Sequence, residues 1–194
     1  MSALPIARLS VDEYLALDRA AEVPSEYHDG EMLPVASVSV EHADIGANLA
    51  VWAKKALRSS PCRMTGPSVR VRVKLTKFVI PDLMIYCGKP LVIDEFRDTV
   101  TNPKVIIEIL SPSTADYDYG TKFILYRGLP SFEEYVLVSQ NEARVEVYRK
   151  TQDGFWVLRT CSGLDAVVPI ESIGAMLPLT DVYDGIEFRQ RPED

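Results

Sequence analysis

The sequence predicts an α/β fold in which one central mixed β-sheet is flanked by helices. Three observations predict it. Residues 41–58 carry apolar side chains at helical spacing, and residues 68–74 alternate valine with basic residues as a half-buried strand does. Residues 104–110 are apolar on both faces, as expected for a central strand that is covered on both sides. Helices and strands that follow one another in this way favour a sheet covered by helices.

Short local signals predict the elements of the first half of the chain. Residues 10–13 (Ser-Val-Asp-Glu) form a capping box, which predicts a short helix from Val11 to about Asp18. Residues 26–31 predict a strand, a turn at Asp29-Gly30 and a second strand. In the long helix that follows, the residues expected to face the core are Ile45, Leu49, Trp52 and Ala56.

The second half of the chain predicts further strands around one helix. Residues 78–86 predict a strand that is interrupted at Pro81-Asp82. Residues 111–116 carry turn and helix-start signals, and a helix is expected from there to about Gly128. The remaining strands are expected at 134–138, 143–148 and 154–160, with short additional strands from residue 166 onward.

Length and composition favour one globular domain over residues 1–194. The chain is 47% hydrophobic and 25% charged, and its 194 residues can bury a core without staples. No apolar run reaches the roughly 18 residues that cross a bilayer, and the N-terminus lacks a secretory signal. Cys62, Cys87 and Cys161 form no CxxC pair, so we expect reduced, mostly buried thiols in a cytoplasmic protein.

Charge is distributed unevenly along the chain. The net charge of -7 counts against a large surface that contacts phosphates. No acidic residue occurs between Asp44 and Asp82, however, and that stretch is basic. A local anionic partner is one explanation of this basic stretch. A solvated helix face together with an exposed strand face is an equally good explanation. The candidates for nucleic-acid contact are Lys54, Lys55, Arg58, Arg70, Arg72 and Lys74.

Glu108 is the anomaly of the predicted central strand. A buried carboxylate is costly unless it is paired or coordinates a metal. Asp82 follows a proline at the break in a neighbouring strand, and two such carboxylates can hold Mg²⁺ with several waters. Those waters can supply the nucleophile for phosphodiester hydrolysis. The alternative is a structural ion pair between Glu108 and a lysine or arginine.

Lys122 adds a third group to this pair. A lysine near a metal-bound water can orient it and offset charge that develops on a phosphate. Asp118 lies four residues before Lys122, so a surface helix pair is the alternative. Tyr126 lies one turn beyond on the same face, where it either donates a hydrogen bond in the site or packs.

These motifs resemble the pattern of the Uma2 (DUF820) family from about Ser10 to Ile186. The resemblance rests on Pro81-Asp82, residues 108–114 (Glu-Ile-Leu-Ser-Pro-Ser-Thr) and residues 118–122 with Tyr126, and also on residues 27–31 and 145–149. It implies a restriction-endonuclease-like core of the PD-(D/E)XK class and a metal-dependent endonuclease activity on DNA. The usual lysine of that motif would stand at Leu110, and the resemblance implies that Lys122 replaces it.

The resemblance also implies a set of site residues. Asp82, Glu108 and the backbone carbonyl of Ile109 would hold Mg²⁺ or Mn²⁺, and Lys122 would position the attacking water. Glu26 matches the family glutamate before the Asp-Gly turn and would be a further metal or water ligand, or else an exposed strand-end carboxylate. Two more residues, Tyr126 and His42, would lie next to the site rather than act as catalytic groups. His42 matches a histidine of the family. In the alternative interpretation it is a structural group at the start of the helix.

Two other functions compete with the nuclease. One is a binding or regulatory module that keeps the nuclease fold without activity, which the net charge of -7 favours. The other is a structural dimerisation domain in which Glu108 pairs internally. A homodimer is expected in either case from the apolar C-terminal strands. The sequence shows no Rossmann fingerprint, P-loop or Ser-His-Asp signature, and its two histidines are too few for a histidine-rich metal site.

Overall fold

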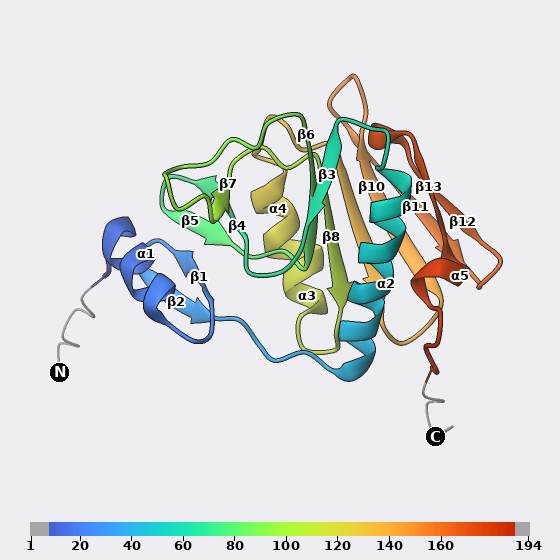
Figure 1. Cartoon of the computed structure of the whole chain (residues 1–194), viewed down its shortest axis with the longest axis horizontal. Coiled ribbons are helices and arrows are strands. Elements are labelled where there is room, and N and C mark those ends of the chain that lie inside the picture. The colour runs from blue at the N-terminus through green and yellow to red at the C-terminus, as the bar shows by residue number, and fades with distance from the viewer. Residues whose placement is uncertain (1–7, 189–194) are drawn as a thin grey trace.

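A six-stranded mixed sheet forms the centre of the molecule (Figure 1). The computed structural model describes residues 8–188. The strand order is β11-β10-β9-β8-β6-β3, in which β8 and β9 run parallel and the other neighbours run antiparallel. The strands are β3 (Cys62–Thr65), β6 (Leu83–Cys87), β8 (Val105–Leu110), β9 (Glu134–Ser139), β10 (Arg144–Lys150) and β11 (Trp156–Ser162).

A second, smaller sheet lies beside the first and is capped by α1 (Val11–Ala20). Its order is β2-β1-β5-β4-β7. Tyr14 of α1 stacks on Tyr27 with ring centroids 4.6 Å apart, and both pack against Phe78, so this lobe has an aromatic core. The strands are β1 (Ser25–His28), β2 (Glu31–Pro34), β4 (Arg70–Lys74), β5 (Lys77–Val79) and β7 (Thr99–Val100).

Different elements cover the two faces of the six-stranded sheet. One face packs against α2 (Val40–Ala56), α5 (Leu179–Val182) and the hairpin of β12 (Val167–Ile170) and β13 (Ala175–Pro178), which are joined by the 3-10 turn η2 (Glu171–Ile173). The other face packs against α4 (Phe123–Tyr126) and strands of the second sheet. A short helix, α3 (Ala115–Tyr117), and a π-helical turn, η1 (Asp118–Lys122), lead into α4.

Alternation along β8 decides which way Glu108 points. Val105, Ile107 and Ile109 pack into the core beneath α2, whereas Ile106 and Leu110 pack into the core beneath α4. Successive side chains of a strand point to opposite faces. Glu108 therefore points toward the face that carries α4 and the π-helical turn with Lys122.

The predicted α/β fold with a central mixed sheet, flanking helices and extra C-terminal strands is confirmed. Ser10 and Glu13 form the predicted capping box, and residues 25–34 form the predicted hairpin. Two details differ. Ala56, the last residue of α2, is exposed, and Ala53 is buried. The strand expected at 78–86 is two strands, β5 and β6, which belong to different sheets.

The prediction of three reduced thiols is wrong for one pair. Cys62 on β3 lies directly opposite Cys87 on β6, and the two form a disulfide, whereas Cys161 is free. The disulfide was not predicted from the sequence, because β3 was not predicted and the pairing of the two cysteines depends on the register of that strand. Within residues 8–188, no helix is long and apolar enough to cross a membrane. The single domain stays a prediction, and its ends at residues 1–7 and 189–194 lie outside the described part. The homodimer also stays a prediction.

Arg70 corrects the predicted basic surface. Its side chain is 6% exposed, and its Nε donates to Asp18 Oδ2 at 2.8 Å while Nη1 lies 3.0 Å from Asp98 Oδ2. Arg19 binds the same Asp98 at 2.7 Å, and the two arginines lower the pKa of Asp98 to about 2. The alternation expected for β4 fails here because α1 covers the outer face of Arg70. Arg70 is therefore a structural residue and not an exposed contact for nucleic acid.

Replacing Arg70 with alanine should strongly destabilise the protein, because it leaves the Asp18 carboxylate buried without its cation. Loss of one partner from a buried ion pair costs about 3 to 5 kcal/mol. We expect a loss of this size in the free energy of unfolding, measured by urea denaturation at neutral pH. The matched control is Arg72→Ala on the same strand, for which we expect less than about 1 kcal/mol. Equal losses in the two variants would show that the Arg70 pair is not the cause.

Candidate active site

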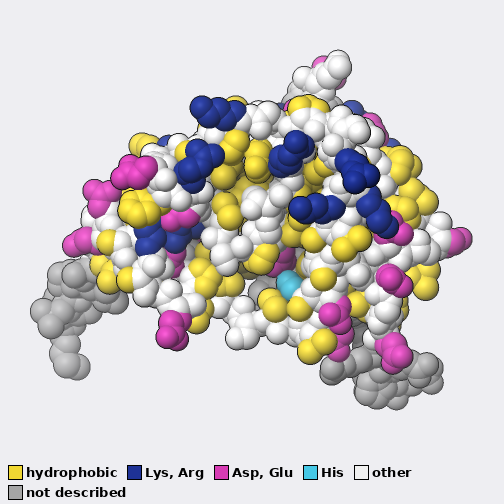
Figure 2. Space-filling view, viewed as in Figure 1, with side chains coloured by type: hydrophobic (Ala, Val, Ile, Leu, Met, Phe, Trp, Pro, Cys, Tyr) yellow, Lys and Arg dark blue, Asp and Glu magenta, His cyan; other side chains and the backbone are white. Residues whose placement is uncertain are grey.

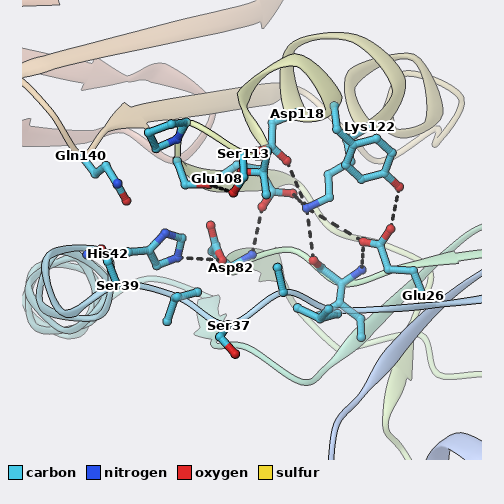
Figure 3. Close-up of a pocket in the computed structure, with 18 of the residues that line it drawn as sticks. Glu26, Ser37, Ser39, His42, Asp82, Glu108, Ser113, Asp118, Lys122 and Gln140 are labelled. Carbon is cyan, nitrogen blue, oxygen red and sulfur yellow. Dashed lines mark hydrogen bonds and ion pairs between the residues drawn. The ribbon is translucent and has the colours of Figure 1, made fainter.

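A cleft of about 500 Å³ opens where the two sheets meet (Figure 3). The segment between β2 and α2 lines one side, and the turn after β8 lines the other. The floor is formed by the link from β5 to β6 together with the π-helical turn. The four residues predicted to be catalytic, which are Glu26, Asp82, Glu108 and Lys122, all line this cleft.

The Lys122 ammonium is the centre of the site. Its Nζ lies 3.0 Å from Glu108 Oε1, 3.2 Å from Asp118 Oδ1 and 3.9 Å from Glu26 Oε1. It also donates to the carbonyl oxygen of Ile80 at 3.4 Å. Burial by itself lowers the pKa of Lys122, but the surrounding carboxylates outweigh it and the pKa lies above its ordinary value. The lysine is therefore held as a charged hydrogen-bond donor, and the surface helix pair considered for Asp118 is in fact buried.

Glu108 is fully enclosed and bonded on both carboxylate oxygens. Besides Lys122, Oε1 accepts from the Tyr126 hydroxyl at 2.9 Å, and Oε2 accepts from the backbone N–H of Asp82 at 3.1 Å. Tyr126 thus donates a hydrogen bond in the site as well as packing. Burial, together with the nearby charges of Asp82 and Asp118, raises the pKa of Glu108 well above its ordinary value despite Lys122.

Asp82 connects the central strand to the long helix. Pro81-Asp82 lies where the chain passes from β5 in one sheet to β6 in the other. Asp82 Oδ2 accepts from the backbone N–H of Ile109 at 2.7 Å, and Oδ1 lies 3.1 Å from His42 Nε2. The His42 backbone N–H is bound by Ser39 Oγ at 3.2 Å. His42 is therefore both part of the helix start and a direct neighbour of Asp82.

Glu26 is a buried member of the site, so the exposed strand-end reading is wrong. It is 6% exposed. Oε1 accepts from the backbone N–H of Ile80 at 3.0 Å, and Oε2 accepts from the Tyr117 hydroxyl at 2.5 Å. His28 Nε2 lies 3.5 Å from the same Oε2. Burial alone would raise the pKa of Glu26, but His28, Lys122 and Tyr117 together lower it below its ordinary value.

Tyr117 and His28 were missed by the sequence analysis. Period-two alternation in β1 places Glu26 and His28 on one face, so the sequence offered a signal for His28. Tyr117 offered a weaker one, because it precedes Lys122 by five residues, which is one turn of a π-helix but not of an α-helix. A π-helical turn at Asp118–Lys122 was not predictable from a pattern that also suits a regular helix.

The cleft contains more negative than positive side chains. Glu26, Asp82, Glu108 and Asp118 face the single ammonium of Lys122. Lys122 is the one lysine or arginine among the described residues that line the cleft. Burial raises the pKa of Asp118 as well as that of Glu108. A cation that entered the cleft would relieve this surplus.

The oxygen donors of the cleft fit a divalent cation. Among residues 8–188, no group of three or more His, Cys, Asp or Glu side chains is arranged to hold a metal ion. Magnesium, however, commonly takes one or two carboxylates and keeps several waters. Asp82, directly before β6, and Glu108, on the adjoining strand β8, offer two such carboxylates, and the surplus of negative charge favours the same ion.

The predicted basic contacts lie away from the cleft. Lys54 and Lys55 are in the last turn of α2 and Arg58 follows its end, whereas His42 is in the first turn. Twelve residues of helix separate His42 from Lys54, which corresponds to about 18 Å. On the face shown in Figure 2, the lysine and arginine side chains gather over the upper half, where α2 ends. Arg72 is half-buried and Lys74 is exposed on β4.

Comparisons with known proteins agree with the fold. A crystal structure described as "a putative nuclease belonging to DUF820", from Anabaena variabilis, superposes with a TM-score of 0.73 at 20% sequence identity. It covers 92% of this chain and 99% of that chain. The chain therefore shares the fold of that protein, a mixed α/β architecture with extra C-terminal strands.

The sequence comparisons assign the family. A model of the Uma2 family, described as "Putative restriction endonuclease", matches residues 11–180, and the chain belongs to this family. Two Synechocystis proteins are related over most of their length. "Uncharacterized protein slr1290" is 28% identical over 187 residues, covering 95% of this chain and 96% of that protein. "Uncharacterized protein sll1609" is 32% identical over 161 residues, covering 82% and 91%.

The surplus of carboxylates predicts opposite effects for two substitutions in metal-free protein. Lys122→Met leaves the three carboxylates of Glu26, Glu108 and Asp118 without their shared cation, and we expect a loss of about 3 to 5 kcal/mol in the free energy of unfolding. Glu108→Gln removes one surplus charge and keeps the side-chain shape, so its stability should equal or exceed that of the wild type. Urea denaturation in EDTA measures both.

The pH dependence of the free energy of unfolding is the control for these two substitutions. Because the folded-state pKa of Glu108 lies above the ordinary value of 4.5, the folded protein binds more protons than the unfolded chain above that pH. The wild type should therefore lose stability relative to Glu108→Gln as the pH rises above 4.5. A Glu108→Gln variant that is several kcal/mol less stable would instead support a structural Glu108–Lys122 ion pair.

Proposed function

We propose that this protein is a metal-dependent endonuclease that hydrolyses phosphodiester bonds of DNA. Asp82, Glu108 and the backbone carbonyl of Ile109 would hold Mg²⁺ or Mn²⁺. The observation that carries the proposal is the convergence of Asp82, Glu108 and Lys122 in one cleft. The family description and the fold support a nuclease of the restriction-endonuclease type, and the metal and the DNA substrate are our extension of it.

Lys122 would act as a hydrogen-bond donor. Its raised pKa keeps the ammonium protonated near neutral pH, so it is unsuited to abstract a proton from water. A protonated lysine can instead orient the attacking water and offset negative charge that develops on the phosphate. Glu108 and Glu26 direct the ammonium, because each contacts Nζ from a different sheet.

Asp82 and Glu108 would supply the two carboxylates that hold the cation. A divalent cation bound there stabilises charge on the phosphate and eases the ionisation of a water. Backbone N–H groups from Ile109 and Asp82 hold one oxygen of each carboxylate, and this fixes the orientation of the two groups before any ligand enters. Preorganised groups of this kind need no rearrangement at the moment of reaction.

Phosphate oxygens would meet hydroxyl groups at the mouth of the cleft. Ser111, Ser113 and Thr114 form a cluster in the turn after β8, in which Ser111 Oγ lies 3.1 Å from Ser113 Oγ and 2.9 Å from Thr114 Oγ1. Serine and threonine commonly donate to phosphate oxygens of nucleic acids. Such contacts position a strand without adding positive charge.

The basic end of α2 would contact DNA beyond the cleft. The separation of about 18 Å between His42 and Lys54 corresponds to roughly five base pairs at 3.4 Å each. A duplex that leaves the cleft along α2 would therefore bring its backbone to Lys54, Lys55 and Arg58. These three contacts, and those of Arg72 and Lys74 on β4, remain predictions.

A binding module with the nuclease fold and no activity is the second candidate. The net charge of -7 favours it, as does the enclosure of Glu108, whose oxygens are both bonded within the protein. The homodimer and the cytoplasmic location expected from the sequence are compatible with both candidates and stay predictions.

Cleavage of supercoiled plasmid DNA separates the two candidates. With Mg²⁺ or Mn²⁺ the wild type should nick or linearise the plasmid, and EDTA should abolish this. Glu108→Gln, Asp82→Asn and Lys122→Met should each lower the rate at least 100-fold, since each removes a group that acts on the reacting phosphate or its cation. Gel electrophoresis over a time course measures the rates.

Lys104→Met and Glu133→Gln are matched controls, because they replace the same residue types in an ion pair outside the cleft. Both should cleave like the wild type. A folded wild type that leaves plasmid, single-stranded DNA and RNA intact with either metal would contradict the nuclease and support the binding module. Cleavage of RNA alone would correct the substrate.

A further inference from the structure

A second groove, of about 680 Å³, lies between α4 and the hairpin of β10 and β11. It shares no described residue with the cleft that contains Lys122, so the two are separate sites. Its volume is in the range of ligand sites, although it is open rather than enclosed. Apart from two glycines, the described residues that line it are Ile124, Arg127, Lys150, Phe155 and Trp156.

Aromatic and apolar side chains gather in this groove. The centroid of the Trp156 ring lies 5.2 Å from that of Phe123 and 5.2 Å from that of Phe132, so core residues hold the indole in place. Its outer part is half-exposed. Phe155 is 72% exposed and Ile124 is 65% exposed. Single exposed apolar residues are common on protein surfaces, but several in one groove indicate a binding surface.

Two cations flank these side chains. Lys150 pairs directly with Trp156 in the β10–β11 ladder, and side chains in such opposite positions are neighbours. The Arg127 guanidinium carbon lies 5.4 Å from the centroid of the Phe123 ring, which contacts Trp156 in turn. Among the described residues, neither cation forms an ion pair, as Arg144 and Arg149 do elsewhere in the sheet.

The charge of this groove is opposite to that of the cleft. No aspartate or glutamate is among the described residues that line it. Asp153 lies in the adjoining turn, but it is exposed and outside the lining. In a chain with a net charge of -7, two unpaired cations beside exposed rings form a local surface that complements an anion with flat apolar groups.

We propose that this groove binds a single strand of nucleic acid, whose bases stack on Phe155 and Trp156 and whose phosphates pair with Arg127 and Lys150. Proteins that bind single strands combine cations along the backbone with aromatic rings on which bases stack. The inference goes beyond the proposed function, because binding in the groove needs neither the metal nor the cleft.

A single strand fits the groove better than a duplex or an acidic peptide. In a duplex the faces of the bases stack on one another and are closed to a protein ring. An acidic peptide would pair with both cations, but it would use Phe155 only through its apolar area, and a leucine there would serve as well. Dependence of binding on the aromatic face therefore distinguishes the strand from the peptide.

Binding of a thymine 12-mer in EDTA tests the groove apart from the cleft. Without a cation the cleft presents surplus negative charge to a polyanion, so metal-free binding reports on the groove. Neutralisation of two phosphates should raise the dissociation constant roughly 7-fold between 50 and 200 mM NaCl, measured by fluorescence anisotropy. Tryptophan emission should also fall on binding, because Trp156 is half-exposed, whereas Trp52, the other tryptophan of the chain, is 3% exposed.

Variants of Phe155 show whether a base stacks there. Phe155→Leu keeps apolar bulk without an aromatic face and should weaken binding about 10-fold. Phe155→Tyr keeps the ring and should bind within about 2-fold of the wild type. The matched control is Phe96→Leu, because Phe96 is 63% exposed in a turn outside the groove, and this variant should bind like the wild type. Melting temperatures verify that each variant is folded.

Variants of the two cations show whether they contact phosphates. Arg127→Met and Lys150→Met should each weaken binding and lower the slope of log affinity against log salt by about 0.7, the value for one phosphate of a single strand. Lys55→Met, in the last turn of α2, is the matched control and should leave affinity and slope unchanged. Binding that depends on Lys55 and on neither groove cation would overturn the proposal.

Failure of the groove and failure of the nuclease are distinguishable. A wild type that cleaves DNA with Mg²⁺ but does not bind the 12-mer in EDTA overturns the groove and leaves the nuclease in place. Binding that depends on Phe155 and Arg127 in a protein that cleaves no nucleic acid supports the groove alone. Equal binding by Phe155→Leu and the wild type, or tighter binding of a duplex of the same length, overturns the single strand as occupant. Preference for an acidic peptide of glutamate and phenylalanine over the 12-mer overturns it too.

Discussion

The Lys122 ammonium, buried among carboxylates, is the interaction on which the arrangement of the site depends. Its partners come from separate parts of the fold: Glu26 from the smaller sheet, Glu108 from the central strand and Asp118 from the same π-helical turn. A charge this deeply buried is tolerated only when it is paired and hydrogen-bonded. The lysine therefore joins the two sheets, and a change in their relative position would separate it from Glu26 or Glu108.

The backbone aims these groups by three local devices. Alternation in β8 points Glu108 toward the helical segment, and the break at Pro81-Asp82 lets the chain change sheets while it presents a carboxylate. The π-helical turn adds one residue per turn and brings Asp118 and Lys122 to face the cleft. The break at Pro81-Asp82 and the π-helical turn are departures from regular structure, and π-helical turns often occur at functional sites.

The sequence was informative where a residue violated its local pattern. Glu108 in an apolar strand and Asp82 after a proline could be predicted as site residues, because a buried carboxylate is costly unless it is paired or coordinates a metal. Tyr117 and Gln140 satisfy the local patterns of a helix and a turn, so only the tertiary structure shows that they enter the cleft. Arg70 is the reverse case: its alternation in β4 predicted exposure, but α1 covers that face and supplies Asp18. Contacts between distant segments, including Cys62 with Cys87, depend on strand register that local patterns do not contain.

Electrostatics limits how this cleft can meet a polyanion. Among the described residues, the walls carry four carboxylates and one lysine, and the basic side chains of Lys54 and Lys55 lie in the last turn of α2. A phosphate that approaches without a cation meets net negative charge in a site of low dielectric, where repulsion is strong. In the proposed function, the hydroxyl groups at the mouth would donate to phosphate oxygens without adding positive charge, which would leave charge neutralisation to the proposed cation. The same arrangement that makes the empty cleft repulsive would make cation and substrate binding mutually dependent, so affinity for nucleic acid and affinity for the metal should rise together.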